Sequence, residues 1–113
     1  MKVYISGPMK GRHNLNEEAF ANYAELLREH GHIPVNPHDI AVTRFRKETD
    51  DAYYERCLAA DFLELRMCDA IIMMPDWVDS QGARREQQYA VDHKIKIAYN
   101  ISDLDGMKGR SSR

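Results

Sequence analysis

Five consecutive apolar residues, Ala70 to Met74, stand between an aspartate and a proline. A strand with one solvent-exposed face alternates polar and apolar residues, whereas a strand covered on both faces is apolar throughout. The run therefore predicts a central parallel strand, in a sheet that has helices on both faces. A polar loop over residues 76–80 follows, and then a helix that begins at Gln81 with Asp79 or Ser80 as its N-cap.

Three more short runs of strand composition alternate with helical patterns. Strands are predicted at residues 2–6, 32–36 and 95–99, and helices at residues 14–30 and 50–67. Pro34 places the second strand at or near a sheet edge, because proline has no amide hydrogen to donate. This order predicts an α/β fold: a single-domain, doubly wound, flavodoxin-like parallel sheet of four to five strands with helices on both faces. Its commonest form puts the first strand between the second and the third.

The chain of 113 residues suits one domain, which we assign to residues 1–100. Residues 37–49 are polar and basic, so they predict a long loop or a flap over the ends of the strands. Residues 101–113 are polar and predict a flexible C-terminal tail. A chain of this size buries only about two-thirds of the surface that its unfolded form exposes, so association between copies would add stability.

The charge balance narrows the kind of partner. Sixteen basic and 18 acidic residues give a formal net charge of -2, which favours neither a general nucleic-acid surface nor an anionic membrane. No apolar run approaches the ~20 residues of a membrane-spanning helix, and the first residues do not have the pattern of a secretory signal. Cys57 and Cys68 have no redox or metal spacing, so reduced thiols in a cytoplasm are expected. The composition favours a small-molecule partner.

Glu86 breaks the pattern of the helix that begins at Gln81. It lies three residues after Ala83 and four before Ala90, on the small apolar stripe that faces the sheet. The alternative is an ordinary helix glutamate that leans to solvent or pairs with an arginine. An inward carboxylate one turn past a loop suited to anions favours a functional role.

Asp61 repeats this feature on the preceding helix. It lies three residues after Leu58 and four before Leu65, inside the apolar arc. Alone, it would more simply be a buried, hydrogen-bonded structural residue. As a pair, Asp61 and Glu86 match what glycosidic bond cleavage requires, since one carboxylate captures the oxocarbenium-like carbon and the other protonates the leaving group.

Two loops are expected to meet at the carboxyl edge of the sheet, where doubly wound folds bind ligands. The loop of residues 7–13 carries Lys10 and Arg12, and it faces the loop of residues 76–82, where a helix N-terminus offers unpaired amides. Together they suit a phosphate or a phosphorylated sugar. An ordinary turn with solvated charges is the alternative, because the glycine spacing matches neither a dinucleotide-binding nor a P-loop motif.

Other residues have two interpretations or none. Tyr4 is a strand residue whose hydroxyl could orient Glu86, and Trp77 either stacks on a base or fills the rim of the site. The five histidines form neither H-E-x-x-H nor a zinc-spaced cluster with the cysteines, so no metal is expected.

Several of these segments together resemble the nucleoside 2-deoxyribosyltransferase-like superfamily. The similar segments are Val3 to Met9, Gly31 to Pro37, Asp61, Cys68 to Ala70, and Asp79 to Ala83 with Glu86 and Ala90. The chain is most similar to the small, often phage-borne branch called domain of unknown function 4406, over roughly residues 2–99. The resemblance implies an enzyme without a cofactor. It also implies a homodimer or a larger homo-oligomer, because sites in this superfamily are often completed by a neighbouring subunit.

The resemblance implies roles for three residues in the chemistry. Glu86 would be the nucleophile that attacks the anomeric carbon of a 2'-deoxyribonucleoside. Asp61 would handle the base or its proton, and Tyr4 would support Glu86.

It also implies how substrate is bound. The branch that hydrolyses deoxynucleoside 5'-monophosphates grips phosphate with a first-loop cation, here Lys10 or Arg12, and with the serine six before the glutamate, here Ser80. The other expected substrate-binding residues are Gly7, Gly82, Trp77 and His38. The first loop reads GPMKGR, which departs from the more arginine-rich turn of those hydrolases.

The sequence therefore predicts an enzyme that cleaves the N-glycosidic bond of a 2'-deoxynucleoside or its 5'-monophosphate, by hydrolysis or base exchange, in a bacterial or phage-infected cytoplasm. The leading alternative is a nucleotide-binding or sensing module of the same fold that does no chemistry. A scaffold that only docks to a protein is the third hypothesis.

Overall fold

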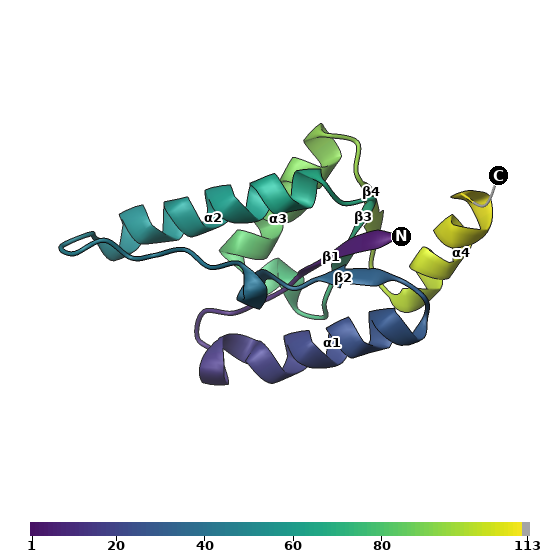
Figure 1. The fold of residues 1–113 in the computed structure, drawn as a ribbon, viewed down its shortest axis with the longest axis horizontal. Coiled ribbons are helices and arrows are strands. Elements are labelled where there is room, and N and C mark those ends of the chain that lie inside the picture. Colours follow the sequence, from purple (N-terminus) through teal and green to yellow (C-terminus); the bar gives the residue numbers. More distant parts are fainter. Residues whose placement is uncertain (112–113) are drawn as a thin grey trace.

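The structure is a computed structural model that describes residues 1–111. In this part of the chain, strands alternate with α-helices (Figure 1). The strands are β1 (Lys2–Ser6), β2 (Ile33–Val35), β3 (Ala70–Met73) and β4 (Lys96–Ala98). The α-helices are α1 (Glu17–Glu29), α2 (Asp50–Arg66), α3 (Gln81–Asp92) and α4 (Ile101–Ser111). Short 3₁₀ helices, η1 (His13–Asn16), η2 (Pro37–Asp39) and η3 (Trp77–Asp79), lie in the loops after β1, β2 and β3.

The strands form one parallel sheet in the order β2-β1-β3-β4. In the central pair, Tyr4 lies opposite Ile71 and Ser6 lies opposite Met73. The chain leaves β1 toward β2 and returns on the other side of β1 to form β3, so the switch point lies between β1 and β3. The prediction of a flavodoxin-like, doubly wound parallel sheet with the first strand between the second and third is confirmed, and residues 1–111 supply four strands.

Each face of the sheet has its own apolar core, because successive side chains of a strand point to opposite faces. Val3 and Ile5 of β1 face a core that includes Phe20 and Leu27 of α1 and Leu104 of α4. The next cluster lies on the other face and contains Tyr4, Ile71, Met73, Leu65 of α2 and Ala83 and Ala90 of α3. The prediction of helices on both faces is therefore confirmed.

The helix starts are set by short polar side chains. The Oγ1 of Thr49 accepts a hydrogen bond from the amide of Ala52 and caps α2. Ser80 caps α3 in the same way, by accepting from the amide of Ala83. Ser80 was one of the two residues expected in that position.

The first helix begins three residues later than predicted. Asn14, Leu15 and Asn16 have φ of 48°, 54° and 63°, which is the left-handed region, and α1 starts only at Glu17. Left-handed residues interrupt a right-handed helix. The Asn16 side chain instead donates to the carbonyl of Pro8, which joins the start of α1 to the loop after β1.

The C-terminal segment is not the flexible tail that the sequence predicted. Ile101–Ser111 form α4. The side chain of its Leu104 is fully buried, and Ile101 and Met107 pack against the same core. Residues 112–113 of the predicted tail lie outside the described residues. None of the helices within residues 1–111 combines the length and the apolar composition that a bilayer crossing requires.

Residues 40–49 form an arm rather than a flap over the strand ends. In Figure 1 this loop runs beside α2 away from the sheet and turns back at the start of α2. The Arg56 guanidinium of α2 bonds to both carboxylate oxygens of Glu48 and lies 3.9 Å from the ring centre of Phe45. That hydrogen bonding lowers the pKa of Glu48 to about 2. The arm is fastened to α2, and it lengthens the molecule to 50 Å against 28 and 23 Å in the other directions.

Candidate active site

Glu86 lies on the face of α3 that packs against the sheet. Ala83, Glu86 and Ala90 are the buried residues of this helix, and Glu86 is only 5% exposed. The inward orientation predicted from helical spacing is confirmed. A carboxyl group in this position costs free energy unless hydrogen bonds satisfy it.

Two hydroxyls of β1 satisfy the carboxyl group of Glu86. The Tyr4 hydroxyl donates to Oε2 and the Ser6 hydroxyl donates to Oε1, each over 2.6 Å. Tyr4 and Ser6 are two residues apart on a strand, so both point to the α3 face, and both are fully buried. Both oxygens of the carboxyl group are therefore held by the central strand of the sheet.

Asp61 of α2 completes the group. Its carboxyl group is partly buried and lies within hydrogen-bonding reach of Glu86 and Tyr4. Burial raises the pKa of Asp61, and the hydrogen bonds from Glu86 and Tyr4 act against that increase. The structure therefore places carboxyl groups from two helices next to each other, and their joint role in chemistry stays a prediction.

The two carboxyl groups cannot both be ionised at low cost. Burial raises the pKa of Glu86, and Asp61 raises it further, whereas the hydroxyls of Ser6 and Tyr4 lower it. Burial and the negative charge of Glu86 also raise the pKa of Tyr4, which keeps its phenol protonated and donating. Two carboxyls in contact titrate as a pair and share one proton over the range between their two ionisations. Such a pair can supply one carboxylate and one acid at the same time.

The phosphate-binding residues predicted in the two loops are only partly brought together. The Nζ of Lys10 lies 4.9 Å from the ring centre of Tyr54, a residue of α2. The Tyr54 hydroxyl would be 3.2 Å from a Cβ at Gly82, in the first turn of α3. Lys10 and Gly82 therefore lie against Tyr54, which no sequence pattern singled out as a site residue, and the Ser80 hydroxyl would be 3.9 Å from the same Cβ at Gly82.

Arg12 and Gly7 have structural contacts instead. Arg12 is 3.8 Å from the carboxylate of Asp76, so it joins the loop after β1 to the loop after β3. A Cβ at Gly7 would lie 2.6 Å from the sulfur of Met74, so this position has room only for glycine. The two loops meet as predicted. The missing side chain of Gly7 lets the loop after β1 pack closely against Met74.

Trp77 and His38 do not contact the Glu86 group in any described interaction. Trp77 packs against the core on the Tyr4 face of the sheet, 6.0 Å from the ring of Tyr99. His38 lies edge-on to Phe20 of α1 at 4.9 Å. Their predicted substrate contacts stay predictions, and Trp77 fits the alternative of a residue that fills the rim.

Ser6 is the residue of the group that the sequence analysis missed. The signal was present, because a hydroxyl two residues after Tyr4 must share its face of the strand. It is obscured because Ser6 stands directly before a glycine and a proline, which mark the end of the strand.

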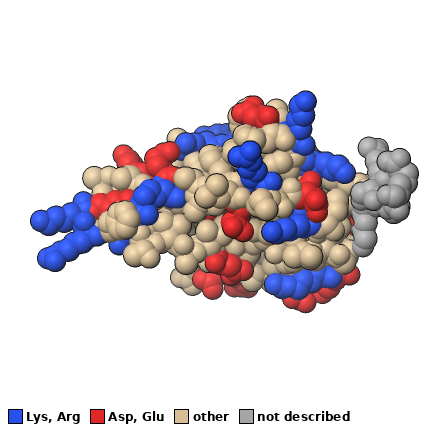
Figure 2. Space-filling model, turned by 45° about the horizontal axis from the view of Figure 1, so that its top comes forward, with Lys and Arg blue, Asp and Glu red and all other residues tan. Residues whose placement is uncertain are grey.

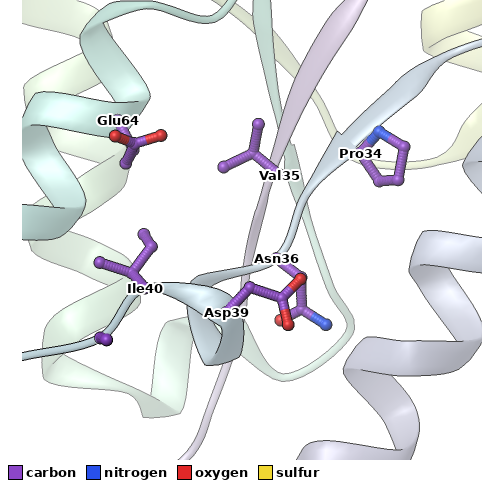
Figure 3. Close-up of a pocket in the computed structure, with 7 residues that line it drawn as sticks. Pro34, Val35, Asn36, Asp39, Ile40 and Glu64 are labelled. Atoms are coloured by element: carbon purple, nitrogen blue, oxygen red, sulfur yellow. The ribbon is translucent and has the colours of Figure 1, made fainter.

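Tyr4, Ser6 and Glu86 are buried from solvent in this structure. A hollow of about 410 Å³ lies at the β2 edge of the sheet, between β2, η2 and α2 (Figure 3). The residues that line it are Pro34, Val35, Asn36, Asp39, Ile40, Ala41 and Glu64. Val35 and Ile40 also pack against the core that contains Tyr4, so the hollow is on the same face of the sheet. Asp61 is the least buried member of the Glu86 group.

The surface around these elements has no single sign of charge. Figure 2 shows acidic and basic side chains interspersed, with Lys and Arg projecting at the end of the molecule that carries the arm. Within residues 1–111, no three His, Cys, Asp or Glu side chains gather as a metal site would require.

Comparisons with known proteins agree with the fold. A family model described as "Domain of unknown function (DUF4406)" matches residues 1–99. A 2-deoxyribosyltransferase from Bacillus psychrosaccharolyticus has a similar structure, with a TM-score of 0.66 and 15% identity over 86% of this chain and 69% of that one. A 2-desoxiribosyltransferase from Leishmania mexicana is also similar in structure, with a TM-score of 0.58 and 22% identity. That match covers 85% of this chain and 61% of the Leishmania chain. No curated protein matches the sequence. The resemblance noted from the motifs is thus confirmed, and at these identities the structural likeness establishes the fold.

Proposed function

The chain belongs to the DUF4406 family, and from this premise we propose that it cleaves the N-glycosidic bond of a 2'-deoxynucleoside or its 5'-monophosphate through a covalent bond to Glu86. The two similar solved structures are named as deoxyribosyltransferases, which supports this class of reaction. Their identities of 15% and 22% leave the activity of this chain to be argued from its own site.

The observation that carries the proposal is the buried pair of Glu86 and Asp61 with two hydroxyls. Among the described residues, the partners of Glu86 are the Tyr4 and Ser6 hydroxyls and the Asp61 carboxyl. None of these groups is a cation, so the negative charge of an ionised Glu86 is not neutralised by an ion pair. In a site of low dielectric constant, such a charge stabilises a developing oxocarbenium carbon more strongly than it would in water.

The reaction has two steps. In the first, a carboxylate oxygen of Glu86 bonds to C1' while the bond from C1' to the base nitrogen breaks. The base leaves with the electron pair of that bond and takes the one proton that the carboxyl pair shares, with Asp61 as the donor. In the second, Asp61 takes a proton from water as the water oxygen bonds to C1', and Glu86 leaves as a carboxylate. A second base in place of water would give transfer instead of hydrolysis.

The neighbourhood of Tyr54 supports a phosphorylated substrate. Lys10 supplies a positive charge there, and the first turn of α3, where the Tyr54 hydroxyl lies close to Gly82, supplies backbone amides that can bind an anion. Arg12, the other candidate cation, already forms an ion pair with Asp76. The 5'-monophosphate is therefore the first substrate to test, with Lys10 and Ser80 as its expected contacts.

Chromatography for free base tests the proposal. The purified protein is incubated with each of the four deoxynucleoside 5'-monophosphates, the corresponding nucleosides and the ribonucleotides. We expect base release from at least one deoxy substrate, and adding a second base then separates hydrolysis from transfer. Glu86→Gln should lower the rate by on the order of 10³-fold or more, because it removes the nucleophile.

Asp92→Asn is the matched control, because it neutralises an exposed carboxylate of the same helix. It should keep the wild-type rate. Saturable nucleotide binding without any cleavage by the folded wild-type protein would overturn the proposal in favour of a binding module.

The proposal includes a homodimer or a larger assembly in a cytoplasm. Two large apolar side chains support association, since Phe45 of the arm and Leu63 of α2 are each more than 60% exposed and line the same hollow. Exposed apolar groups gathered on one region favour a contact with another protein surface.

A further inference from the structure

Ser6 makes a direct side-chain contact with the proposed nucleophile. It is the last residue of β1, it is fully buried, and its hydroxyl donates to Oε1 of Glu86 over 2.6 Å. Tyr4 donates to the other oxygen, Oε2, at the same distance. A strand residue at this point could be an apolar residue, as Ile5 is on the other face.

We propose that Ser6 is a positioning residue for Glu86, whose hydroxyl fixes the rotation of the carboxylate and favours its ionised form for attack on C1'. This inference rests on the proposed role of Glu86 as the nucleophile.

Rotation is fixed because the two donors bind different oxygens. With Tyr4 alone, the carboxylate could turn about its terminal bond while it kept one hydrogen bond. With Ser6 on Oε1, the plane of the group is defined by two points on β1. Each oxygen keeps a further lone pair, so one of them is free to attack.

Ionisation is favoured because a hydroxyl donor binds a carboxylate more strongly than it binds a neutral acid. Burial and Asp61 both disfavour the ionised form of Glu86, and the hydroxyls of Ser6 and Tyr4 oppose them. The titratable groups that face this network are Asp61 from α2, Tyr4 from β1 and Cys68, which acts on Tyr4. Without Ser6, only the phenol of Tyr4 would oppose burial.

The test is a titration of the Glu86 carboxyl carbon by ¹³C NMR, without substrate, in the wild type and in Ser6→Ala. Glu86→Gln identifies the signal by its loss. We expect the midpoint in Ser6→Ala to move up by roughly one to two pH units, which corresponds to the loss of one hydrogen bond to a charged group. Ser6→Cys keeps a weaker donor of similar size and should give an intermediate midpoint.

Ile5→Val is the matched control. Ile5 is adjacent, equally buried and on the opposite face of β1, so this change costs packing energy without touching Glu86. Its midpoint should equal that of the wild type. An unchanged midpoint in Ser6→Ala would overturn the inference.

Activity gives a second and separate readout. In Ser6→Ala the pH profile of kcat/KM should move to higher pH with the NMR midpoint, because both readouts report the ionisation of the same carboxyl pair. An NMR shift with an unmoved kcat/KM profile would sink the catalytic part of the inference. A wild-type protein that cleaves no substrate would count against the proposed function. This outcome does not involve the Ser6 variants, so it can be told apart from a failure of the inference about Ser6.

Discussion

At the scale of single residues, the balance at Glu86 has a measurable consequence for stability. Burial outweighs the two hydroxyl donors, so the folded protein holds a proton on the carboxyl pair that the unfolded chain has already released. A group whose pKa is higher in the folded state adds stability below its unfolded pKa and loses that contribution as pH rises through its folded value.

We therefore predict that the free energy of unfolding falls as pH rises from the ordinary carboxyl range to above neutrality. The slope from one such proton is at most about 1.4 kcal/mol per pH unit. Glu86→Gln should flatten this dependence and gain stability relative to the wild type as pH rises. Urea unfolding at several pH values between 5 and 8 measures it, with Asp92→Asn as the control. Parallel curves for wild type and Glu86→Gln would contradict the prediction.

The residues of the site were predictable where a single periodicity decided the matter. Helical spacing placed Glu86 and Asp61 inward, and strand composition placed Tyr4 in β1. Ser6 required the alternation of the strand to be followed to its last residue. The surroundings of His38 and Arg12 depend on contacts between segments distant in sequence, with Phe20 and Asp76, and no local pattern encodes them.

At the scale of elements, α4 shows how a polar segment can belong to the core. Ile101, Leu104 and Met107 recur every three residues and lie against the α1 face of the sheet, while Ser102 and Asp105 are exposed. The tail looked polar because its apolar residues are few. Burial of one leucine by the rest of the fold outweighs that composition.

Leu104→Ala should therefore lower the free energy of unfolding by about 2–4 kcal/mol, since it leaves a cavity in a fully packed site. Thermal or urea unfolding of the whole chain measures this. Ser102→Ala, an exposed change on the same helix, should stay within about 0.5 kcal/mol of the wild type. Equal stabilities for the two variants would mean that α4 does not pack on the core.

The order and type of the strands and of the first three α-helices followed from alternation of apolar patterns. The boundaries of these strands and helices were less predictable from the same patterns. Because Asn14, Leu15 and Asn16 are left-handed, α1 starts later than its pattern predicts, and α2 is capped by Thr49 although Asp50 and Asp51, which are also good N-cap residues, follow it. Such ends depend on individual hydrogen bonds, such as that from Asn16 to Pro8, which a periodicity does not contain.

At the scale of the whole molecule, the arm and the outer face of α2 form the largest departure from a closed globule. The hollow lined by Phe45, Ala59, Ala60 and Leu63, among others, lies between them, and Leu63 is 68% exposed. A compact monomer gains nothing from this exposure.

We predict that light scattering after gel filtration gives the mass of a dimer or a larger assembly, and that Leu63→Arg shifts it to the monomer. A charge at the centre of an apolar contact would be buried without a partner, which is costly. Val91→Arg, at an exposed apolar position on α3, should keep the wild-type mass. A wild-type monomer at tens of micromolar would contradict the prediction.

The register between β1 and β3 determines whether Tyr4 and Ser6 can bind Glu86. Tyr4 and Ser6 face Glu86 only while Tyr4 lies opposite Ile71 and Ser6 opposite Met73. A slip of one residue along β1 would turn both hydroxyls toward α1 and bring Ile5 against Glu86. Helix and strand content would hardly change, so circular dichroism would not detect the error. The proposed glycosidic cleavage would detect it, which would make turnover per molecule a test of whether a refolded preparation has found its correct strand register.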